Sequence, residues 1–323
     1  MELPRRYFLQ LAAGAAAVPV TRCISWAQDY PSRPARIIVG SAAGDLTDIV
    51  GRLIGQWLSE RLNQSFIIEN RPGAGSNVGT EAAVRAPADG YTLLMVAPSA
   101  AINASLYSNL KFSFIRDITP VAGIFRAPLV VVIHPSAPAR TVTELVAYAK
   151  ANPGKLSFAS PGIGTGPHMA GELFKMIAGV DIVHVPYRGA ANALTDLMTG
   201  QVQLMITAAA NDQIKAGKLH ALAVTGATRW EQLPDLPTVA DFLPGYEASA
   251  WFGVGAPKNT PAGIIVKLNK EINAALDDPK IRARLSDLGG TVLSGSPADF
   301  GRHIAAETEK WAKVVKFAGV KAE

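Results

Sequence analysis

SPGIGTGPHMAGELFK, residues 160–175, joins a short apolar run at Leu156–Ala159 to a helical pattern of apolar residues. The glycines in this turn keep side chains out of it, Thr165 stands where a helix N-cap is expected, and Pro167 suits a first helical turn. A strand, a glycine-rich turn and a helix N-terminus together present free backbone N–H groups, which favour a carboxylate, phosphate or sulfate. The alternative is an ordinary strand-to-helix turn, so an anion site requires a second binding surface elsewhere in the chain.

The first 27 residues have the pattern of an export signal. Arg5 and Arg6 precede the apolar run Tyr7–Val20, and Ser25-Trp26-Ala27 offers small residues for cleavage. The run is too short to span a bilayer, which favours a cleaved signal peptide over a membrane anchor. PRRYFLQ resembles the twin-arginine export signal, although Pro4 and Gln10 depart from that pattern, so the general secretory route stays open.

The remaining chain has no cysteine and little net charge. Cys23 is the single cysteine of the 323 residues and is removed with the predicted signal peptide, which excludes disulfides and cysteine-ligated metals. Residues 1–27 carry three arginines and one glutamate, so the net charge falls from +5 to +3 after cleavage. No basic run is present, which argues against a nucleic-acid partner, and no apolar stretch beyond the signal is long enough for a membrane span.

The first half of the mature chain predicts a β-α-β-α-β unit with parallel strands. The expected strands are Ala35–Val39, Phe66–Glu69 and Tyr91–Ala97, with helices at Asp48–Leu62 and Val78–Ala86 between them. Each strand ends in a turn of small residues. In open α/β sheets, ligands bind at these carboxyl ends of the strands.

A second series of the same kind follows and suggests two similar lobes. It follows the apolar strand Leu129–His134 and a helix at Val142–Ala151. Its strands are Leu156–Ala159, Ile182–Val185 and two near Leu204–Ile206 and Leu222–Val224, with helices between the first three. A long proline-rich loop spans residues 226–247. Trp251–Ala256 reads as another apolar strand, and three helices end the chain, at Pro261–Leu276, Lys280–Leu288 and Pro297–Phe317. If these helices return to the first lobe, the chain crosses between lobes twice, and two extended crossings make a hinge.

Motifs of catalysis and of cofactor binding are absent from the sequence. It contains no G-x-S-x-G, H-E-x-x-H or P-loop, and its five histidines, at 134, 168, 184, 220 and 303, lie far apart. GAGSNVG at 73–79 lacks the G-x-G-x-x-G spacing of a dinucleotide site. We therefore predict no catalytic residue, no metal and no cofactor, while an α/β enzyme with an unfamiliar site stays as an alternative.

Turns rich in small residues support binding. Residues 40–47, 72–77 and 98–101 belong to the first lobe, and residues 161–167 belong to the second. Turns that face each other across a cleft would clamp a small anion, because a carboxylate removed from water must receive several hydrogen bonds.

Several segments closely resemble the Bug family, the periplasmic substrate-binding proteins of tripartite tricarboxylate transporters. They are SPGIGTGPHMAGELFK, HVPYRGAANALTDLMTGQV, NRPGAGSNVGTEAA, DGYTLLM and LPDLPTVADFLPGYEASAWFGVGAPKNTP, and the similarity runs from Tyr30 to about Phe300. The resemblance implies an α/β protein with the two-lobe, Venus-flytrap fold of periplasmic binding proteins, each lobe a sheet flanked by helices. It implies lobe I at 28–128 and 250–323 and lobe II at 129–249. It also implies a monomer without enzymatic activity that binds a small carboxylic acid.

The resemblance also implies the binding residues. They come from the turns of both lobes and from the V-P-Y-[KR]-G motif: Ser41, Ala42, Gly44, Asp45, Thr47, Gly75, Ser76, Ser99, Asn103, Gly164, Thr165, Gly166, His168, Tyr187 and Arg188. Asp45 departs from the family, which has glycine there. An aspartate beside a carboxylate would repel it by roughly 1–4 kcal/mol at about 4 Å.

We therefore interpret the sequence as a periplasmic solute receptor that closes on a small organic acid and delivers it to the subunits of a membrane transporter. The alternative role is the binding component of a sensing system, which presents the closed form to a sensor protein.

Overall fold

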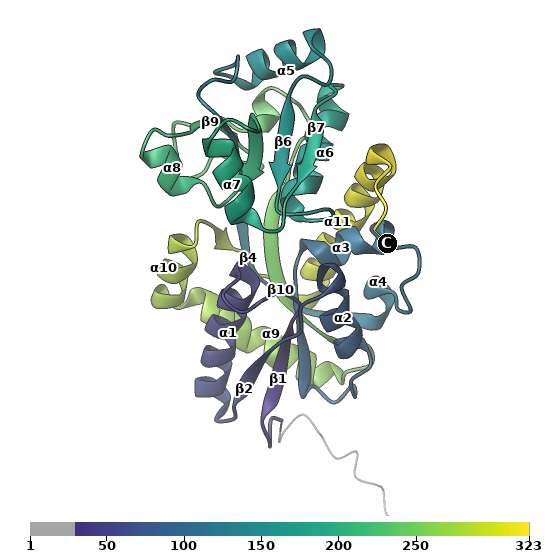
Figure 1. Cartoon of the computed structure of the whole chain (residues 1–323). Coiled ribbons are helices and arrows are strands. Elements are labelled where there is room, and N and C mark those ends of the chain that lie inside the picture. Colours follow the sequence, from purple (N-terminus) through teal and green to yellow (C-terminus); the bar gives the residue numbers. More distant parts are fainter. Residues whose placement is uncertain (1–29, 323) are drawn as a thin grey trace, which may run out of the picture. The chain divides into compact units, whose positions relative to one another are not determined.

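The computed structural model describes residues 30–322, and the predicted signal peptide with Cys23 lies outside them. From Pro31 onward the chain forms one compact unit that contains two mixed β-sheets, each flanked by helices (Figure 1). This arrangement confirms the predicted α/β class with two sheet-centred halves. Within the described residues, no helix has both the length and the apolar character that a bilayer span requires.

The first sheet begins with the predicted parallel unit. Strands β1 and β2 pair in parallel, as do β1 and β3, and the residues of β1 that face the core are fully buried. The elements are β1 (Ala35–Val39), α1 (Leu46–Leu62), β2 (Phe66–Asn70), the 3₁₀ turn η1 (Ala74–Ser76), α2 (Asn77–Val84), β3 (Thr92–Val96), α3 (Pro98–Leu106), α4 (Phe114–Asp117) and β4 (Ile118–Pro128).

Two later strands complete this sheet. Strand β10 (Ser249–Pro257) inserts between β3 and β4 and runs antiparallel to both, and β11 (Thr291–Val292) extends the edge beyond β4. The order is β11-β4-β10-β3-β1-β2. Strand β4 was not predicted from the sequence, because Pro120, Gly123 and Pro128 obscure the pattern of a strand.

The second sheet has the order β7-β6-β8-β5-β9. Its elements are β5 (Val130–Ile133), α5 (Val142–Ala151), β6 (Ser157–Ser160), α6 (Gly166–Ala178), β7 (Val183–Pro186), α7 (Ala190–Met198), β8 (Leu204–Thr207), α8 (Asn211–Lys215) and β9 (His220–Val224). Strand β5 runs antiparallel to both β8 and β9, whereas β6 is parallel to β7 and β8. Strands β6, β7 and β8, with α6 and α7 between them, therefore repeat the parallel unit of β1, β2 and β3, because the order β7-β6-β8 corresponds to β2-β1-β3. This is the second β-α-β-α-β series that the sequence predicts. Strand β5, which enters directly from β4, precedes the series and runs antiparallel to it.

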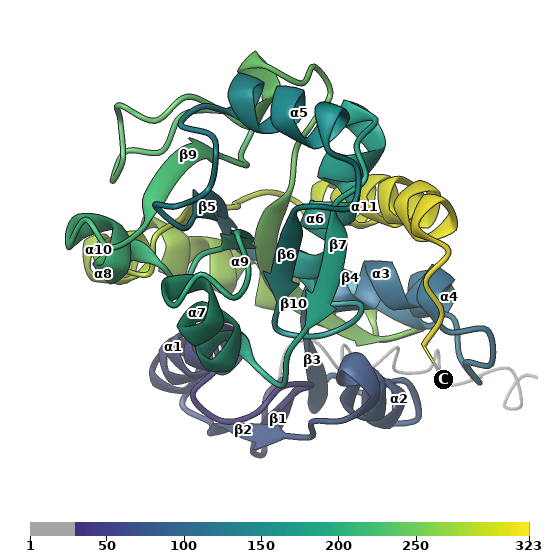
Figure 2. The ribbon, with the colours of Figure 1, turned by 45° about the horizontal axis from the view of Figure 1, so that its top comes forward.

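The last three helices add no new layer and pack against the existing sheets and helices. They are α9 (Ala262–Asp277), α10 (Pro279–Asp287) and α11 (Pro297–Ala318), after the 3₁₀ turn η2 (Val239–Asp241). Helix α11 begins at a capping box between Ser296 and Asp299. It contacts α3 and β4 beside the first sheet and α6 beside the second, and both views show it next to α3 and α6 (Figures 1 and 2).

The chain passes between the sheets at two places, which a single hydroxyl joins. Thr225 is fully buried, and its Oγ1 accepts from the Leu129 N–H at 2.7 Å and lies 2.5 Å from the carbonyl of Ala248. Its backbone N–H donates to the Leu129 carbonyl, and its carbonyl accepts from the Ala248 N–H. The two crossing segments are thus fastened side by side. That the halves move as separate lobes, with boundaries at 128/129 and 249/250, stays a prediction.

Candidate functional site

A cavity of about 230 Å³ lies where elements of both sheets meet. Four predicted residues line it: Thr47 at the start of α1, Ser99 at the start of α3, and Thr165 with Gly166 at the start of α6. The other lining residues are Ala97, Pro98, Leu129, Pro167, Ala248, Ser249, Ala250, Phe252 and Trp311. The beginnings of three helices therefore converge on one space.

Thr165 shapes the turn that opens α6. Its side chain accepts a hydrogen bond from the His168 N–H, as an N-cap does, and its hydroxyl donates to the Gly162 carbonyl at 2.7 Å. Among the described residues, nothing accepts from the N–H of Gly166, and this residue lines the cavity. A helix N-terminus with a free N–H group, as expected from the sequence, favours a negatively charged group of a ligand.

His168 supports this turn from behind. Its Nδ1 accepts from the Gly164 N–H at 3.0 Å, and the residue is only 1% exposed. The ring stacks on His184 at 3.9 Å between centroids, and His184 Nε2 lies 2.7 Å from Ser160 Oγ. Burial lowers the pKa of His168 to about 3, with the nearby charges of His184 and Lys175 acting in the same direction. Burial likewise lowers the pKa of His184 to about 4. Both rings are therefore neutral at neutral pH.

The turn before α1 is held by a buried carboxylate that the sequence reasoning did not single out. Asp48 is 2% exposed and accepts hydrogen bonds from Arg52 Nε, from the Gly44 N–H and from Asn70 Nδ2. Burial alone would raise the pKa of Asp48, but these bonds, with that from Arg52 foremost, hold it below the usual range. Asn70 also donates to the Ser41 carbonyl. Because the Gly44 N–H donates to Asp48, it is not available to a ligand.

The other predicted residues of this turn lie outside the cavity lining. Ala42, Gly44 and Asp45 are exposed, and the side chain of Asp45 makes no capping hydrogen bond. The hydroxyl of Ser41 is buried and has no partner among the described residues.

The turn at 73–76 is tied to the start of α3. Asn103 Nδ2 donates to the Gly75 carbonyl at 2.6 Å and to Asn77 Oδ1 at 3.0 Å. Ser99 Oγ lies 3.4 Å from Ser76 Oγ. Ser99 lines the cavity, whereas Gly75, Ser76 and Asn103 do not.

Tyr187 and Arg188 do not line the cavity. The hydroxyl of Tyr187 donates to Asp196 Oδ2 at 2.7 Å, and burial together with this bond raises the pKa of Tyr187 to about 12. Arg188 is exposed and forms no ion pair among the described residues. The bond from Tyr187 to Asp196 ties the turn after β7 to α7.

The sequence reasoning missed the apolar wall of the cavity. Phe252 comes from β10 and Trp311 from α11, and Trp311 is 1% exposed with its Nε1 donating to the buried Glu307. Both belong to segments that read as ordinary core, and nothing in their periodicity indicates which side faces a cavity. No charged side chain is among the residues that line this cavity. In residues 30–322 no cluster of three or more His, Asp or Glu side chains has the arrangement of a metal site.

The comparisons with known proteins identify the family of the chain. The sequence profile described as the tripartite tricarboxylate transporter family receptor, TctC, matches residues 50–320. This chain belongs to that family. The resemblance to the Bug proteins is confirmed as well: BugT of Bordetella pertussis is 36% identical over 316 residues, which cover 96% of this chain and 95% of BugT.

Solved structures agree. Rpa4515 of R. palustris, solved with adipate, is 38% identical with a TM-score of 0.80, covering 91% of this chain and 99% of that one. MatC from Rhodopseudomonas palustris, with bound malate, is 31% identical with a TM-score of 0.76, covering 88% of this chain and 100% of MatC. The periplasmic binding protein BugD is 34% identical, with a TM-score of 0.76 and coverage of 91% and 100%. The family and these structures are substrate-binding proteins, which confirms the prediction that the chain is not an enzyme.

Proposed function

We propose that this chain is a periplasmic receptor that binds a small organic acid in the cavity between the sheets and delivers it, as a monomer, to a tripartite tricarboxylate transporter. The observation that carries the proposal is the meeting of three helix beginnings, with Thr47, Ser99 and Thr165, around one space. The hydroxyls of Thr47 and Ser99 and the free N–H of Gly166 can donate to a carboxylate without a fixed counter-charge. Thr165, whose hydroxyl already donates to the Gly162 carbonyl, holds the turn that presents this N–H.

The neutral, mostly apolar lining suggests the kind of acid. A hydroxyl on the body of the ligand, placed against Phe252, Trp311 or Leu129, would lose its hydration without gaining a partner. We propose that the preferred acid carries an apolar body, held against these side chains. Adipate therefore serves as the first probe, and malate, with a shorter and hydroxylated body, as its comparison.

A ligand can close the two halves on itself only if it makes contacts in the closed form that it does not make in the open form. Thr165 and Gly166 come from the second half, and Thr47 and Ser99 come from the first. A ligand that touches both sets stabilises the closed form over the open one.

The test is a calorimetric titration of the purified protein with adipate and with malate, repeated on Thr165→Ala and on the hydroxyl-preserving Thr165→Ser. We expect adipate to bind more tightly than malate and Thr165→Ala to weaken binding by roughly fivefold to tenfold, because the turn loses about 1 kcal/mol of hydrogen bonding. The same change removes an N-cap, so the free energy of unfolding should fall by about 1 kcal/mol and the melting temperature should fall slightly with it. Unchanged affinity in Thr165→Ala would remove this turn from the site, and chemical turnover of the bound acid would overturn the receptor function.

A further inference from the structure

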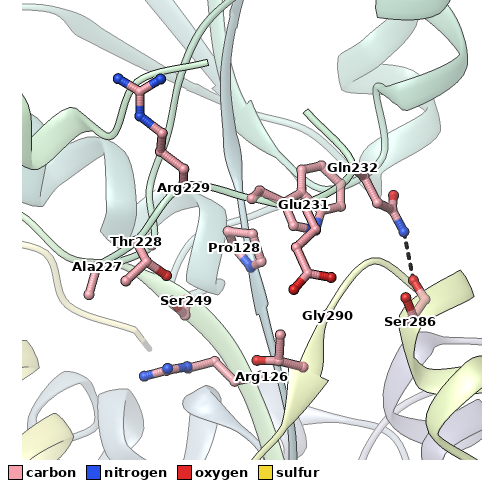
Figure 3. Close-up of a pocket in the computed structure, with 13 residues that line it drawn as sticks. Arg126, Pro128, Ala227, Thr228, Arg229, Glu231, Gln232, Ser249, Ser286 and Gly290 are labelled. Atoms are coloured by element: carbon pink, nitrogen blue, oxygen red, sulfur yellow. Dashed lines mark hydrogen bonds between the residues drawn. The ribbon is translucent and has the colours of Figure 1, made fainter. Parts of the chain in front are cut away.

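A second cavity, of about 120 Å³, lies beside the crossing strands and shares only Ser249 with the lining of the first (Figure 3). Arg126 and Pro128 of β4 form its base together with Ser249 of β10. The segment 226–232, which follows β9, forms one wall, and the α10–β11 corner forms the other. The volume is well above what a single water molecule requires.

Two contacts fix the walls to each other. Gln232 Nε2 donates to the Ser286 carbonyl at 2.6 Å, as Figure 3 shows. The indole of Trp230 packs on Gly289, where an added Cβ would stand 2.9 Å from Trp230 Cζ2. Gly289 also has a φ of +89°, a conformation that favours glycine. These contacts therefore fix the segment 226–232 against the α10–β11 corner.

The base of this cavity contains an arginine, Arg126, whose charge helps to lower the pKa of the nearby Glu247. Arg126 is half-buried, and among the described residues no group forms a hydrogen bond or an ion pair with its guanidinium. The nearby carboxylate of Glu247 is already occupied, because one oxygen pairs with Lys310 at 2.8 Å and the other accepts from Ser249 at 2.7 Å. A partly desolvated guanidinium gains from a carboxylate that can accept two hydrogen bonds.

An anion is also present in the lining, at a separate position. Glu231 forms no hydrogen bond or ion pair with any described residue, and it does not reach Arg126. Figure 3 shows its carboxylate toward Gly290, while the guanidinium of Arg126 lies below Thr228 and Ser249. Arg229, the second arginine of the lining, points away from both groups in Figure 3 and donates to the Pro234 carbonyl. A simple carboxylate would meet repulsion from Glu231, and a simple amine would meet repulsion from Arg126.

We propose that this cavity binds a small amino acid as its zwitterion. The carboxylate of the ligand pairs with Arg126, its ammonium group pairs with Glu231, and the hydroxyl of Thr228 supplies a further hydrogen bond. This site is distinct from the cavity for the organic acid, where no charged side chain is present in the lining.

The test is calorimetric titration of the purified protein with glycine, β-alanine and γ-aminobutyrate, which differ in the distance between their charges. We expect at least one to bind saturably at one site per chain, and acetate and methylamine to bind about tenfold more weakly or worse. Arg126→Gln and Glu231→Gln should each weaken the amino acid by about tenfold or more. Arg284→Gln, which removes an exposed arginine of α10 outside this lining, should leave it unchanged.

The opposite results overturn the proposal. The proposal is wrong if none of the three amino acids binds at about 10 mM, or if acetate binds as tightly as they do. It is also wrong if both charge variants keep the full affinity. Binding that survives Arg126→Gln but weakens in Thr165→Ala would place the amino acid in the first cavity. Because adipate is titrated into the same variants, loss of this proposal leaves the proposed receptor function separately testable.

Discussion

At the scale of single residues, the stacked pair His168 and His184 makes the binding turn sensitive to acid. Both rings have a lower pKa in the folded protein, about 3 and about 4, than the ordinary value of 6.5. The folded state therefore prefers the neutral rings, and their stabilising contribution is complete above about pH 6.5 and is lost as the pH falls toward 4 and below. As the pH falls through that window, each ring lowers the free energy of unfolding by up to about 1.4 kcal/mol per pH unit.

We expect the melting temperature to fall between pH 7 and pH 4.5, and to fall less steeply in His168→Gln. Glutamine retains an acceptor for the Gly164 N–H but takes up no proton in this range. Thermal melts at a series of pH values measure the slope. His220→Gln, on β9 and outside the stacked pair, is the matched control, and an equal slope in His168→Gln and the original protein would show that this ring does not control acid stability.

At the scale of elements, the crossing segments depend on Thr225. Its hydroxyl serves the Leu129 N–H and the Ala248 carbonyl at once, in a fully buried place. Thr225→Val keeps the shape but leaves both backbone groups without this partner, which costs about 1–3 kcal/mol. We expect a lower midpoint of urea unfolding, while Thr225→Ser, which keeps the hydroxyl, should lose less. Equal midpoints for the two variants would contradict this role of the hydroxyl.

Helix α11 places the fluorescent side chain of Trp311 in the wall of the candidate binding cavity. Trp311 lines the cavity, so adipate binding should change the tryptophan emission, and Trp311→Phe should abolish most of that change. The variant should also lose about 1–3 kcal/mol of stability, since the indole N–H to Glu307 disappears. Trp57→Phe on α1, whose indole donates to the Glu271 carbonyl outside the cavity, is the control. A full ligand-induced change in Trp311→Phe would separate this residue from the site.

The local patterns in the sequence predicted much of the fold but little of the wall of the site. The N-cap at Thr165, the parallel strands β1 to β3 and the family were correctly predicted, because caps, turns and apolar runs are local features. The direction of β5 and the existence of β4 depend on pairing with strands far along the chain. The same holds for Phe252 and Trp311, which long-range packing alone brings to the cavity. The role of Asp48 was missed because its partners, Gly44, Arg52 and Asn70, come together only in the folded turn.

At the scale of the whole molecule from Pro31 onward, two sheets share their connections and one long helix. Helix α11 packs on α3 and on α6, and the candidate cavity takes its walls from both sheets and from α11. A motion of one half against the other would therefore change the cavity and the α11 contacts together, while Thr225 keeps the crossing segments in register.

The place of β10 in the first sheet sets an order in time for assembly. β10 lies between β3 and β4, yet it comes more than a hundred residues after β4 along the chain. As the polypeptide emerges during synthesis or transport, β3 and β4 are present long before the strand that joins them, and their edges stay unpaired until residues 249–257 arrive. The five strands of the second sheet come from one continuous segment, so that sheet meets no such delay. Unpaired edges are sites of aggregation, and the first sheet is therefore the half that a chaperone would need to shield.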